Sequence, residues 1–393
     1  MASLTPYEEG ESQTRAESKT YRRNTTLRIR EHVPPKPFTG DYGPSPRPEV
    51  DWTPWKDVPQ WKIDRVEFAL ANPPMETKPP AGPERTLTIT RTLTRPSDGG
   101  ANVVTCFLDG NRAVEYVAKI YDGVDYLLSA WDDGNDAGKG GNLDCMKWAD
   151  RDYSVEAWAY KIMQPVIGNT GIVPTYHGSW TFALQTDQPG RQRWVRMILI
   201  EFIQGQCMLD LIRRAEKEPG RDKVDYSRLP SEEFRLRVLQ NILEAKFTIW
   251  WDAAILHNDV EPRNTMIKPD GSIVIIDFNQ ATLYDFVRYN LKHPKRTNPN
   301  PLPLTPIEWH WPLPGRFDTW AKWVPEPWVE NEELGGEWLI LKYRDAPGFK
   351  PPTAKFLNHS IHSRWSKRLQ QLLEGLGRKP SGDQPHDGPS ARG

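Results

Sequence analysis

Two carboxylates and one carboxamide stand at spacings that suit chemistry on a phosphorylated compound. Asp259 and Asn264 lie five residues apart, and Asp277 directly follows an apolar run at 273–276. Transfer of a phosphoryl group from ATP needs Mg²⁺ held by hard oxygen ligands, a cation on the phosphates, and a carboxylate that orients the acceptor hydroxyl. The spacing therefore predicts that Asp259 serves the acceptor, while Asn264 and Asp277 hold Mg²⁺.

The stretch from His257 to Asn279 resembles the protein-kinase-like superfamily. Its letters HNDVEPRN and DFN resemble the catalytic loop H-x-D-x-x-x-x-N and the metal-binding triplet D-F-G. The step of thirteen residues from Asn264 to Asp277 also matches the spacing in that family. The resemblance implies ATP and Mg²⁺ as cofactors, with His257 bracing the loop and Asp259 as the catalytic base.

Three upstream stretches resemble further parts of the same family. Lys119, in VAKIY, resembles the strand lysine that binds the α- and β-phosphates, so the resemblance implies a catalytic as well as a cofactor-binding role. Glu156, in SVEAW, resembles the helix glutamate that pairs with this lysine. Glu201, Phe202 and Ile203 resemble the hinge at which adenine binds.

Over roughly residues 85–285 the chain looks like uncharacterised kinase-like proteins of filamentous fungi, and it departs from regulated protein kinases at several points. Asn258 stands where those kinases carry an arginine that contacts a phosphorylated activation loop. The triplet His-Asn-Asp instead resembles choline kinases and aminoglycoside phosphotransferases. Asn279 replaces the glycine of D-F-G, and no A-P-E follows. The resemblance therefore implies a constitutive site, with either a protein Ser/Thr or a small molecule as acceptor.

A second function stays open, that of a catalytically weak pseudokinase acting as a binding or scaffold module. Only Gly99-Gly100 stands where a glycine-rich phosphate loop is expected, which favours this alternative. Retention of Lys119, Asp259, Asn264 and Asp277 together favours the enzyme.

Hydrophobic periodicity predicts the elements that must position these residues. Ser231, followed by two glutamates, is the expected N-cap of a long helix. The order of elements, a β-meander followed by helices, predicts an α+β fold of two lobes, with a β-rich N-lobe and a mainly helical C-lobe. The predicted elements are strands at 86–93, 102–108 and 114–121, a helix at 154–163, a strand at 194–202, a helix at 231–254, two short strands around 269–271, and a helix at about 362–376.

Composition divides the chain into four parts. Residues 1–60 combine charge, Ser/Thr and proline with few aliphatic side chains, which predicts a disordered arm. Its Pro34-x-x-Pro37 spacing could bind a protein partner that reads polyproline. The remaining expected parts are an N-lobe at 61–203 with a Gly/Asp-rich insertion at 122–150, a C-lobe at 204–377 with the catalytic loop, and a disordered tail at 378–393.

Bulk composition narrows the class of partner and the compartment. The formal net charge of −1 gives no overall attraction to nucleic acid or to a membrane surface. The three cysteines lie far apart, which indicates a reducing compartment. No stretch approaches the roughly 18 apolar residues of a membrane span, and the N-terminus lacks an apolar signal sequence. We therefore expect a cytoplasmic protein, and these features are also compatible with the nucleus.

Overall fold

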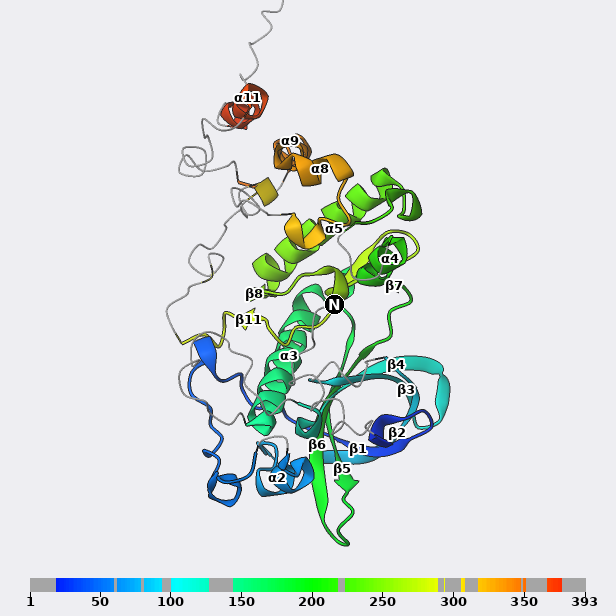
Figure 1. The fold of residues 1–393 in the computed structure, drawn as a ribbon, viewed down its shortest axis with the longest axis vertical. Coiled ribbons are helices and arrows are strands. Elements are labelled where there is room, and N and C mark those ends of the chain that lie inside the picture. Colours follow the sequence, from blue (N-terminus) through cyan, green and yellow to red (C-terminus); the bar gives the residue numbers. More distant parts are fainter. Residues whose placement is uncertain are drawn as a thin grey trace, which may run out of the picture. The chain divides into compact units, whose positions relative to one another are not determined.

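The computed structural model divides the chain into two compact units (Figure 1). The first unit comprises residues within 1–206, 248–260 and 264–293, and the second comprises the remainder. The structure describes residues 19–59, 62–78, 81–93, 100–126, 144–217, 223–288, 293, 305–307, 317–347, 349–350 and 366–376.

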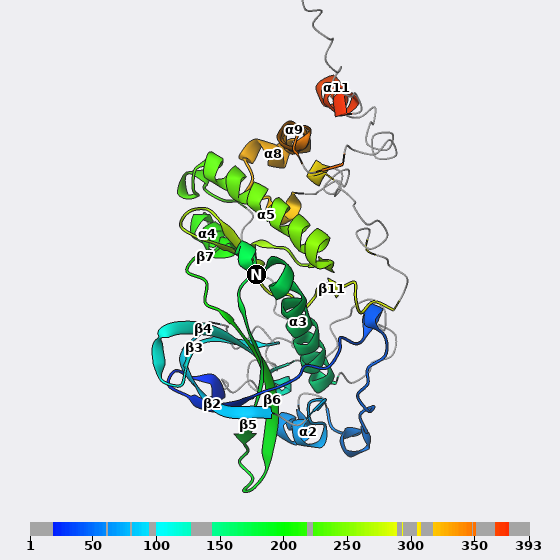
Figure 2. The ribbon, with the colours of Figure 1, turned by 180° about the vertical axis from the view of Figure 1, so that it is seen from behind.

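The first unit is built on a six-stranded antiparallel sheet that closes into a barrel (Figure 1 and Figure 2). The strand order is β1-β2-β3-β4-β6-β5, and pairing of β1 with β5 completes the ring, so none of these strands is left at an open edge. The strands are β1 (Thr26–Glu31), β2 (Ala81–Thr92), β3 (Asn102–Leu108), β4 (Asn111–Tyr121), β5 (Tyr176–Gln185) and β6 (Gln192–Glu201). The predicted three-strand meander is confirmed as β2 to β4, and the predicted strand at 194–202 is β6. Strand β5 was not predicted.

Apolar side chains fill the interior of the barrel. They include Leu87, Ile89, Val104, Cys106, Ala118, Ile120, Phe182 and Met197. Because successive side chains of a strand point to opposite faces, burial of Ala118 and Ile120 in this core places Lys119 and Tyr121 on the outer face of β4. The site is built on that outer face.

The N-terminal segment belongs to the first unit, which corrects the prediction of a disordered arm. Strand β1 buries Leu27 and Ile29 in the barrel core. Residues 1–18 lie outside the described residues, so the correction applies to residues 19–59. The prediction was wrong because composition counts how few apolar residues a segment has. It does not show that those few all face one core.

The proline-rich stretch after β1 packs against its own chain. Pro34, Pro35 and Pro37 are buried, and the indole N–H of Trp158 donates to the carbonyl of Pro35 at 2.8 Å. A partner that reads polyproline would therefore have to displace this stretch. Such a partner stays a prediction.

Helix α3 (Cys145–Ile167) packs on the outside of the barrel, against β4, β5 and β6. It begins after Asp144, whose carboxylate accepts the backbone N–H of Lys147 at 3.0 Å. The predicted helix start at 154 and the predicted end of the insertion at 150 are both wrong, because residues 145–153 are already helical. The capping residue Asp144 ends a stretch rich in Gly and Asp, so composition does not distinguish it from the loop before it. Residues 127–143 lie outside the described residues.

Short elements complete the first unit. The predicted hairpin around Pro269-Asp270-Gly271 is confirmed as β9 (Thr265–Ile267) paired with β10 (Ile273–Ile275). The others are α2 (Arg65–Ala71), β8 (Ile255–Leu256) and β11 (Thr282–Leu283), with 3₁₀ turns at Lys19–Tyr21, Gly40–Tyr42, Thr53–Trp55, Gly123–Asp125 and Gly168–Thr170. β7 (Gln206–Cys207) and the 3₁₀ turn Pro262–Asn264 cross the division between the units.

The second unit is helical where it is described. Its elements are α4 (Met208–Ala215), most of α5 (Glu232–Ala253), α8 (Glu326–Glu330), α9 (Glu332–Tyr343) and α11 (Lys367–Leu376), with 3₁₀ turns at Tyr226–Arg228 and Asp318–Trp320. The expected N-cap of α5 is confirmed, since Ser231 Oγ accepts the N–H of Phe234 at 3.3 Å. The last predicted helix is confirmed over 367–376, and residues 351–365 and the predicted tail at 378–393 lie outside the described residues.

The described part of the chain is thus a mixed α and β fold, with one closed six-stranded barrel and seven α-helices. No helix in these residues is long and apolar enough to cross a membrane.

Candidate active site

A buried lysine joins three elements of the first unit. Lys119 Nζ lies 2.5 Å from Glu156 Oε2 of α3 and 2.5 Å from Asp277 Oδ1, two residues beyond β10. The side chains of Lys119 and Glu156 are 9% and 1% exposed, whereas that of Asp277 is 33% exposed. The structure therefore brings together three of the residues predicted from sequence. The open side of the cluster is the Asp277 side.

Glu156 holds more than the lysine. The hydroxyl of Tyr121 donates to Oε2 at 2.7 Å, and Oε1 accepts the backbone N–H of Phe278 at 3.3 Å. One buried carboxylate thus fixes β4, α3 and the residue after Asp277. Tyr121 was not predicted as a site residue, although its place two residues beyond Lys119 puts it on the same face of the strand.

The cluster separates the pKa values of its groups. Burial would lower the pKa of Lys119, but the carboxylates of Asp277 and Glu156 outweigh burial, and the net pKa is raised. Burial raises the pKa of Glu156 despite the opposing charge of Lys119. For Asp277, burial would raise the pKa, but Lys119 outweighs it and the net pKa is lowered. The site therefore presents a cationic lysine beside a partly exposed anionic aspartate.

The backbone bends sharply at Asp277. Its φ is +67°, in the left-handed region that is uncommon for residues other than glycine and better tolerated by Asp and Asn. The next side chain, Phe278, is fully buried, with its ring 4.5 Å from that of His257 and 5.3 Å from that of Tyr160. Left-handed residues such as this one cluster at active sites and switch regions.

His257 connects the predicted catalytic loop to the strand that carries Asp277. Its Nδ1 accepts the backbone N–H of Asp259 at 3.2 Å, so Nε2 carries the proton and donates to the carbonyl of Ile276 at 2.9 Å. His257 is buried, and both bonds are to backbone groups. In this geometry His257 braces the loop.

Asp259 and Asn264 contact each other directly. Asn264 Nδ2 donates to the backbone carbonyl of Asp259 at 2.9 Å and to its Oδ2 at 2.9 Å. The amide nitrogen is thus occupied, and Asn264 Oδ1 is the oxygen that could coordinate a cation. The backbone N–H of Ile276 donates to the carbonyl of Asn264 at 3.0 Å, which ties this pair to the strand end before Asp277.

The predicted hinge begins at the last residue of β6, the strand that pairs with β4. Ile198 of β6 lies opposite Lys119, three residues before Glu201. The carboxylate of Glu201 accepts the backbone N–H and the hydroxyl of Thr175, at 3.0 and 2.9 Å, so its side chain already has structural partners. Among the residues that the structure describes, the backbone groups of buried Ile203 have no hydrogen-bond partner. A base edge could therefore bind there through the backbone. Phe202 also belongs to this turn, with its ring 6.0 Å from the guanidinium of Arg91.

The connection from β2 to β3 lies at the same end of the sheet as Lys119. Val103, near the start of β3, pairs with Lys119, and Thr92, at the end of β2, pairs with Val104. Gly100 has a φ of +95° and open space where a Cβ would stand. Residues 94–99 lie outside the described residues.

Mg²⁺ with a nucleotide fits the oxygen atoms present here. A kinase-type magnesium site takes few ligands from the protein, because phosphate oxygens and water complete the shell. Asn264 Oδ1 and the partly exposed carboxylate of Asp277 would be those ligands. Within the described stretches, no group of three or more His, Cys, Asp or Glu side chains could hold a metal by itself.

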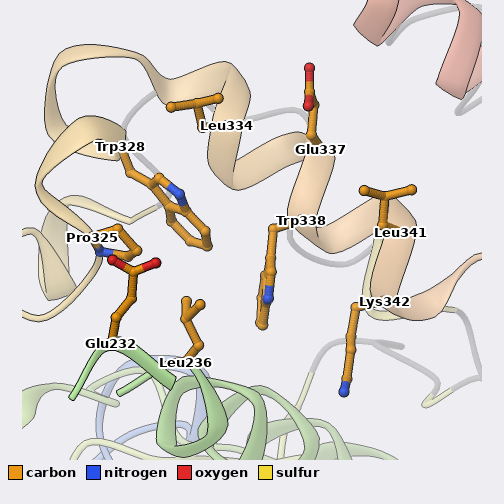
Figure 3. A pocket seen from close by; sticks show the side chains of 9 residues that line it. All are labelled: Glu232, Leu236, Pro325, Trp328, Leu334, Glu337, Trp338, Leu341 and Lys342. Carbon is orange, nitrogen blue, oxygen red and sulfur yellow. The ribbon is translucent and has the colours of Figure 1, made fainter. Parts of the chain in front are cut away.

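The second unit contains a cavity of about 430 Å³ that holds none of the predicted site residues (Figure 3). Its two indoles, Trp328 and Trp338, point toward its centre, with ring centroids 5.5 Å apart, while Glu337 and Leu341 point away. The lining residues are Glu232, Leu236, Pro325, Trp328, Leu334, Glu337, Trp338, Leu341 and Lys342.

Comparison with known proteins adds no relative. No protein-family model matches the chain, and a search of the curated proteins finds no significant match.

Proposed function

We propose that this chain is an ATP- and Mg²⁺-dependent phosphotransferase with an alcohol group as acceptor, built on a two-lobed protein-kinase-like fold. The observation that carries the proposal is the placement of Lys119 between Glu156 and Asp277, 2.5 Å from each. The motifs that resemble the kinase superfamily are separated by up to 158 positions in the chain, and the fold joins them in one network.

Each residue has a physical task in this proposal. Lys119 binds the α- and β-phosphates, and Glu156 holds the ammonium group in place. Asn264 Oδ1 and Asp277 hold Mg²⁺, and the backbone at Glu201, Phe202 and Ile203 binds the base. When bound, ATP supplies the phosphoryl group and Mg²⁺ neutralises charge on it. Asp259 orients the acceptor hydroxyl and takes its proton.

Two lines of support bear on the acceptor. The residues Asn258 and Asn279, and the lack of an A-P-E stretch, favour a small hydroxylated molecule. The resemblance to fungal kinase-like proteins favours a protein Ser/Thr. The acceptor is a hydroxyl group in either case, and the transfer experiment decides whether a small molecule or a protein carries it.

Binding is tested by thermal denaturation with Mg-ATP. A ligand that binds only the folded state stabilises it by about 2.7 kcal/mol at one hundred times its Kd, so Tm should rise in a saturable way. Asp277→Asn should weaken the part of this shift that depends on Mg²⁺. No shift at millimolar Mg-ATP would refute the proposal.

Transfer is tested with labelled ATP and two extracts, one of metabolites and one of proteins. We expect label in one of them, and Asp259→Asn should lower the rate by about 10²- to 10⁴-fold while still binding Mg-ATP. Binding without transfer above the Asp259→Asn level would instead support a pseudokinase that acts as a binding module.

A further inference from the structure

The segment after Asp277 is held by side chains from three separate parts of the first unit. We refer to residues 279–283 as the clasped segment. Its partners include Asp152 on α3, Asn258 in the catalytic loop, and Tyr42 in the N-terminal segment.

The first contact is with one face of α3. Asp152 and Glu156 lie four residues apart, so their side chains share that face. Glu156 accepts the backbone N–H of Phe278, and Asp152 Oδ2 accepts Asn279 Nδ2 at 3.4 Å. Asp152 is buried, and the hydroxyl of Tyr126 also donates to its Oδ2, at 3.3 Å. Two consecutive residues are thus bonded to consecutive turns of the helix.

The second contact comes from the position at which regulated kinases carry an arginine. Asn258 Nδ2 donates to the backbone carbonyl of Gln280 at 2.9 Å and to Thr282 Oγ1 at 2.8 Å. The side chain reaches them from a left-handed backbone, with a φ of +64° that asparagine tolerates. A neutral amide therefore binds the clasped segment directly, where an arginine would need a phosphate.

The third contact comes from the segment that follows β1. The hydroxyl of Tyr42 donates to the carbonyl of Ala281 at 2.5 Å and accepts the backbone N–H of Leu283 at 2.9 Å. Burial raises the pKa of Tyr42 to about 12, so the hydroxyl keeps its proton at neutral pH. Nearby, the carbonyl of Asp41 accepts the backbone N–H of Arg288 at 3.0 Å.

We propose that Asp152, Asn258 and Tyr42 are positioning residues that hold the clasped segment in one conformation, so that the site is assembled without phosphorylation. The effect of these contacts on activity rests on the proposed function, because the clasped segment follows Asp277, the residue assigned to Mg²⁺. The clasp itself is a property of the fold and can be measured without ATP.

The test measures backbone hydrogen exchange in Tyr42→Phe, Asn258→Asp and Asn279→Ala. Each variant removes one contact, and Asn258→Asp keeps a residue type that tolerates the left-handed backbone. We expect the amide of Leu283 to exchange about tenfold faster in Tyr42→Phe, and the amide of Phe278 about tenfold faster in Asn279→Ala. Exchange in β3 and β4 should not change, which shows that each variant is folded.

Two variants serve as matched controls. Tyr284→Phe removes a neighbouring hydroxyl that has no hydrogen-bond partner in the described residues, and Asn169→Ala removes an exposed amide. Exchange in the clasped segment should stay at the wild-type rate in both. Equal exchange in the three clasp variants and the controls would overturn the proposal.

Measurements of turnover test the clasp separately from the proposed phosphotransferase activity. We expect phosphatase treatment to leave turnover unchanged, and the three clasp variants to lower kcat/KM about tenfold. Loss of turnover after phosphatase treatment would overturn the clasp and leave the phosphotransferase intact. Faster exchange in the variants, with no Mg-ATP binding by the wild type, would support the clasp and remove the phosphotransferase.

Discussion

At the scale of single residues, Lys119 stands between two unequal carboxylates. Glu156 is sealed from solvent, whereas a third of the Asp277 side chain is exposed. A charge in a dry environment is costly unless a partner offsets it, so Glu156 depends on Lys119 far more than Asp277 does. This difference suits a site in which Glu156 holds the lysine and Asp277 turns toward a ligand.

Replacing the lysine should expose this dependence. Lys119→Met leaves Glu156 buried without its cation, and we expect the free energy of unfolding at pH 7 to fall by about 3 kcal/mol. Burial then raises the pKa of Glu156 further above its unfolded value, so the folded state binds more protons than the unfolded state. Stability of the variant should therefore fall as pH rises above about 4.5, by up to about 1.4 kcal/mol per pH unit.

Urea unfolding at pH 5 and pH 7 measures this effect. The difference between wild type and Lys119→Met should be smaller at pH 5, where Glu156 is more readily protonated. Lys36→Met, at an exposed lysine that has no partner in the described residues, is the control and should change stability little at either pH. A stability difference that is the same at both pH values would count against a buried, unpaired Glu156.

At the scale of elements, α3 is bonded on two sides. On one side, Asp152 and Glu156 accept hydrogen bonds from the two residues after Asp277. On the other side, the N-terminal segment reaches the helix through Arg47, which pairs with Asp150. The carboxylate of Asp150 also accepts the backbone N–H of Met75 at 2.9 Å. The helix that carries Glu156 is thus held in place in part by Arg47, a residue that composition had assigned to a disordered arm.

Removing Arg47 should loosen this attachment. Arg47→Ala leaves the buried carboxylate of Asp150 without its cation, and we expect the free energy of unfolding to fall by about 3–5 kcal/mol. Adding Asp150→Asn should restore part of the loss, because an amide needs no cation. The control is Arg23→Ala, at an exposed arginine that has no partner in the described residues. Equal effects of Arg47→Ala and Arg23→Ala in urea unfolding would contradict a structural role for the segment.

At the scale of the whole molecule, the first unit is assembled from three separate stretches of chain. The barrel and α3 come from residues before 207, and the site is completed by stretches at 248–260 and 264–293. Phe278 and Asp277 lie in the last stretch and contact Tyr160 and Lys119 in the first. Cutting the chain after β6 would therefore divide both the core and the site.

A fragment of residues 1–206 should not fold as an independent domain. It lacks Asp277, which bonds Lys119, the backbone N–H of Phe278, which bonds Glu156, and the apolar side chains that cover α3, so we expect no sharp thermal transition by circular dichroism. A fragment of residues 1–293 keeps all three stretches and should restore cooperative melting. A cooperative transition in the shorter fragment, at the temperature of the full chain, would show that the first stretch folds alone.

Local patterns predicted most of the regular structure. Period-2 alternation located β2, turn residues on either side located β3 and β4, and the capping serine located the start of α5, because all of these signals lie within a few residues. Strand β5 (Tyr176–Gln185) was missed because burial alternates along it only at its start. Several consecutive buried residues in the strand blur the alternation, since the strand packs against α3 as well as the barrel core.

The candidate site was predicted as a set of residues but not as a geometry. The spacing of Asp259, Asn264 and Asp277 is a property of one loop and one hairpin, so the sequence alone determined it. The pairing of Lys119 with Glu156 was implied only by resemblance, and the contact of Lys119 with Asp277 was not predicted, because contacts across 37 and 158 positions depend on how the chain packs.

Only the tertiary structure decided which additional residues support the site. Tyr42, Tyr121 and Asp152 were not predicted as site residues, and their types are common in any soluble protein. Their effect comes from position, since a hydroxyl or carboxylate becomes important when burial removes water as an alternative partner. The sequence by itself determined which groups could do chemistry. The fold decided that the segment following β1, one helix and the segment after Asp277 hold those groups together, because burial is a property of the packed chain.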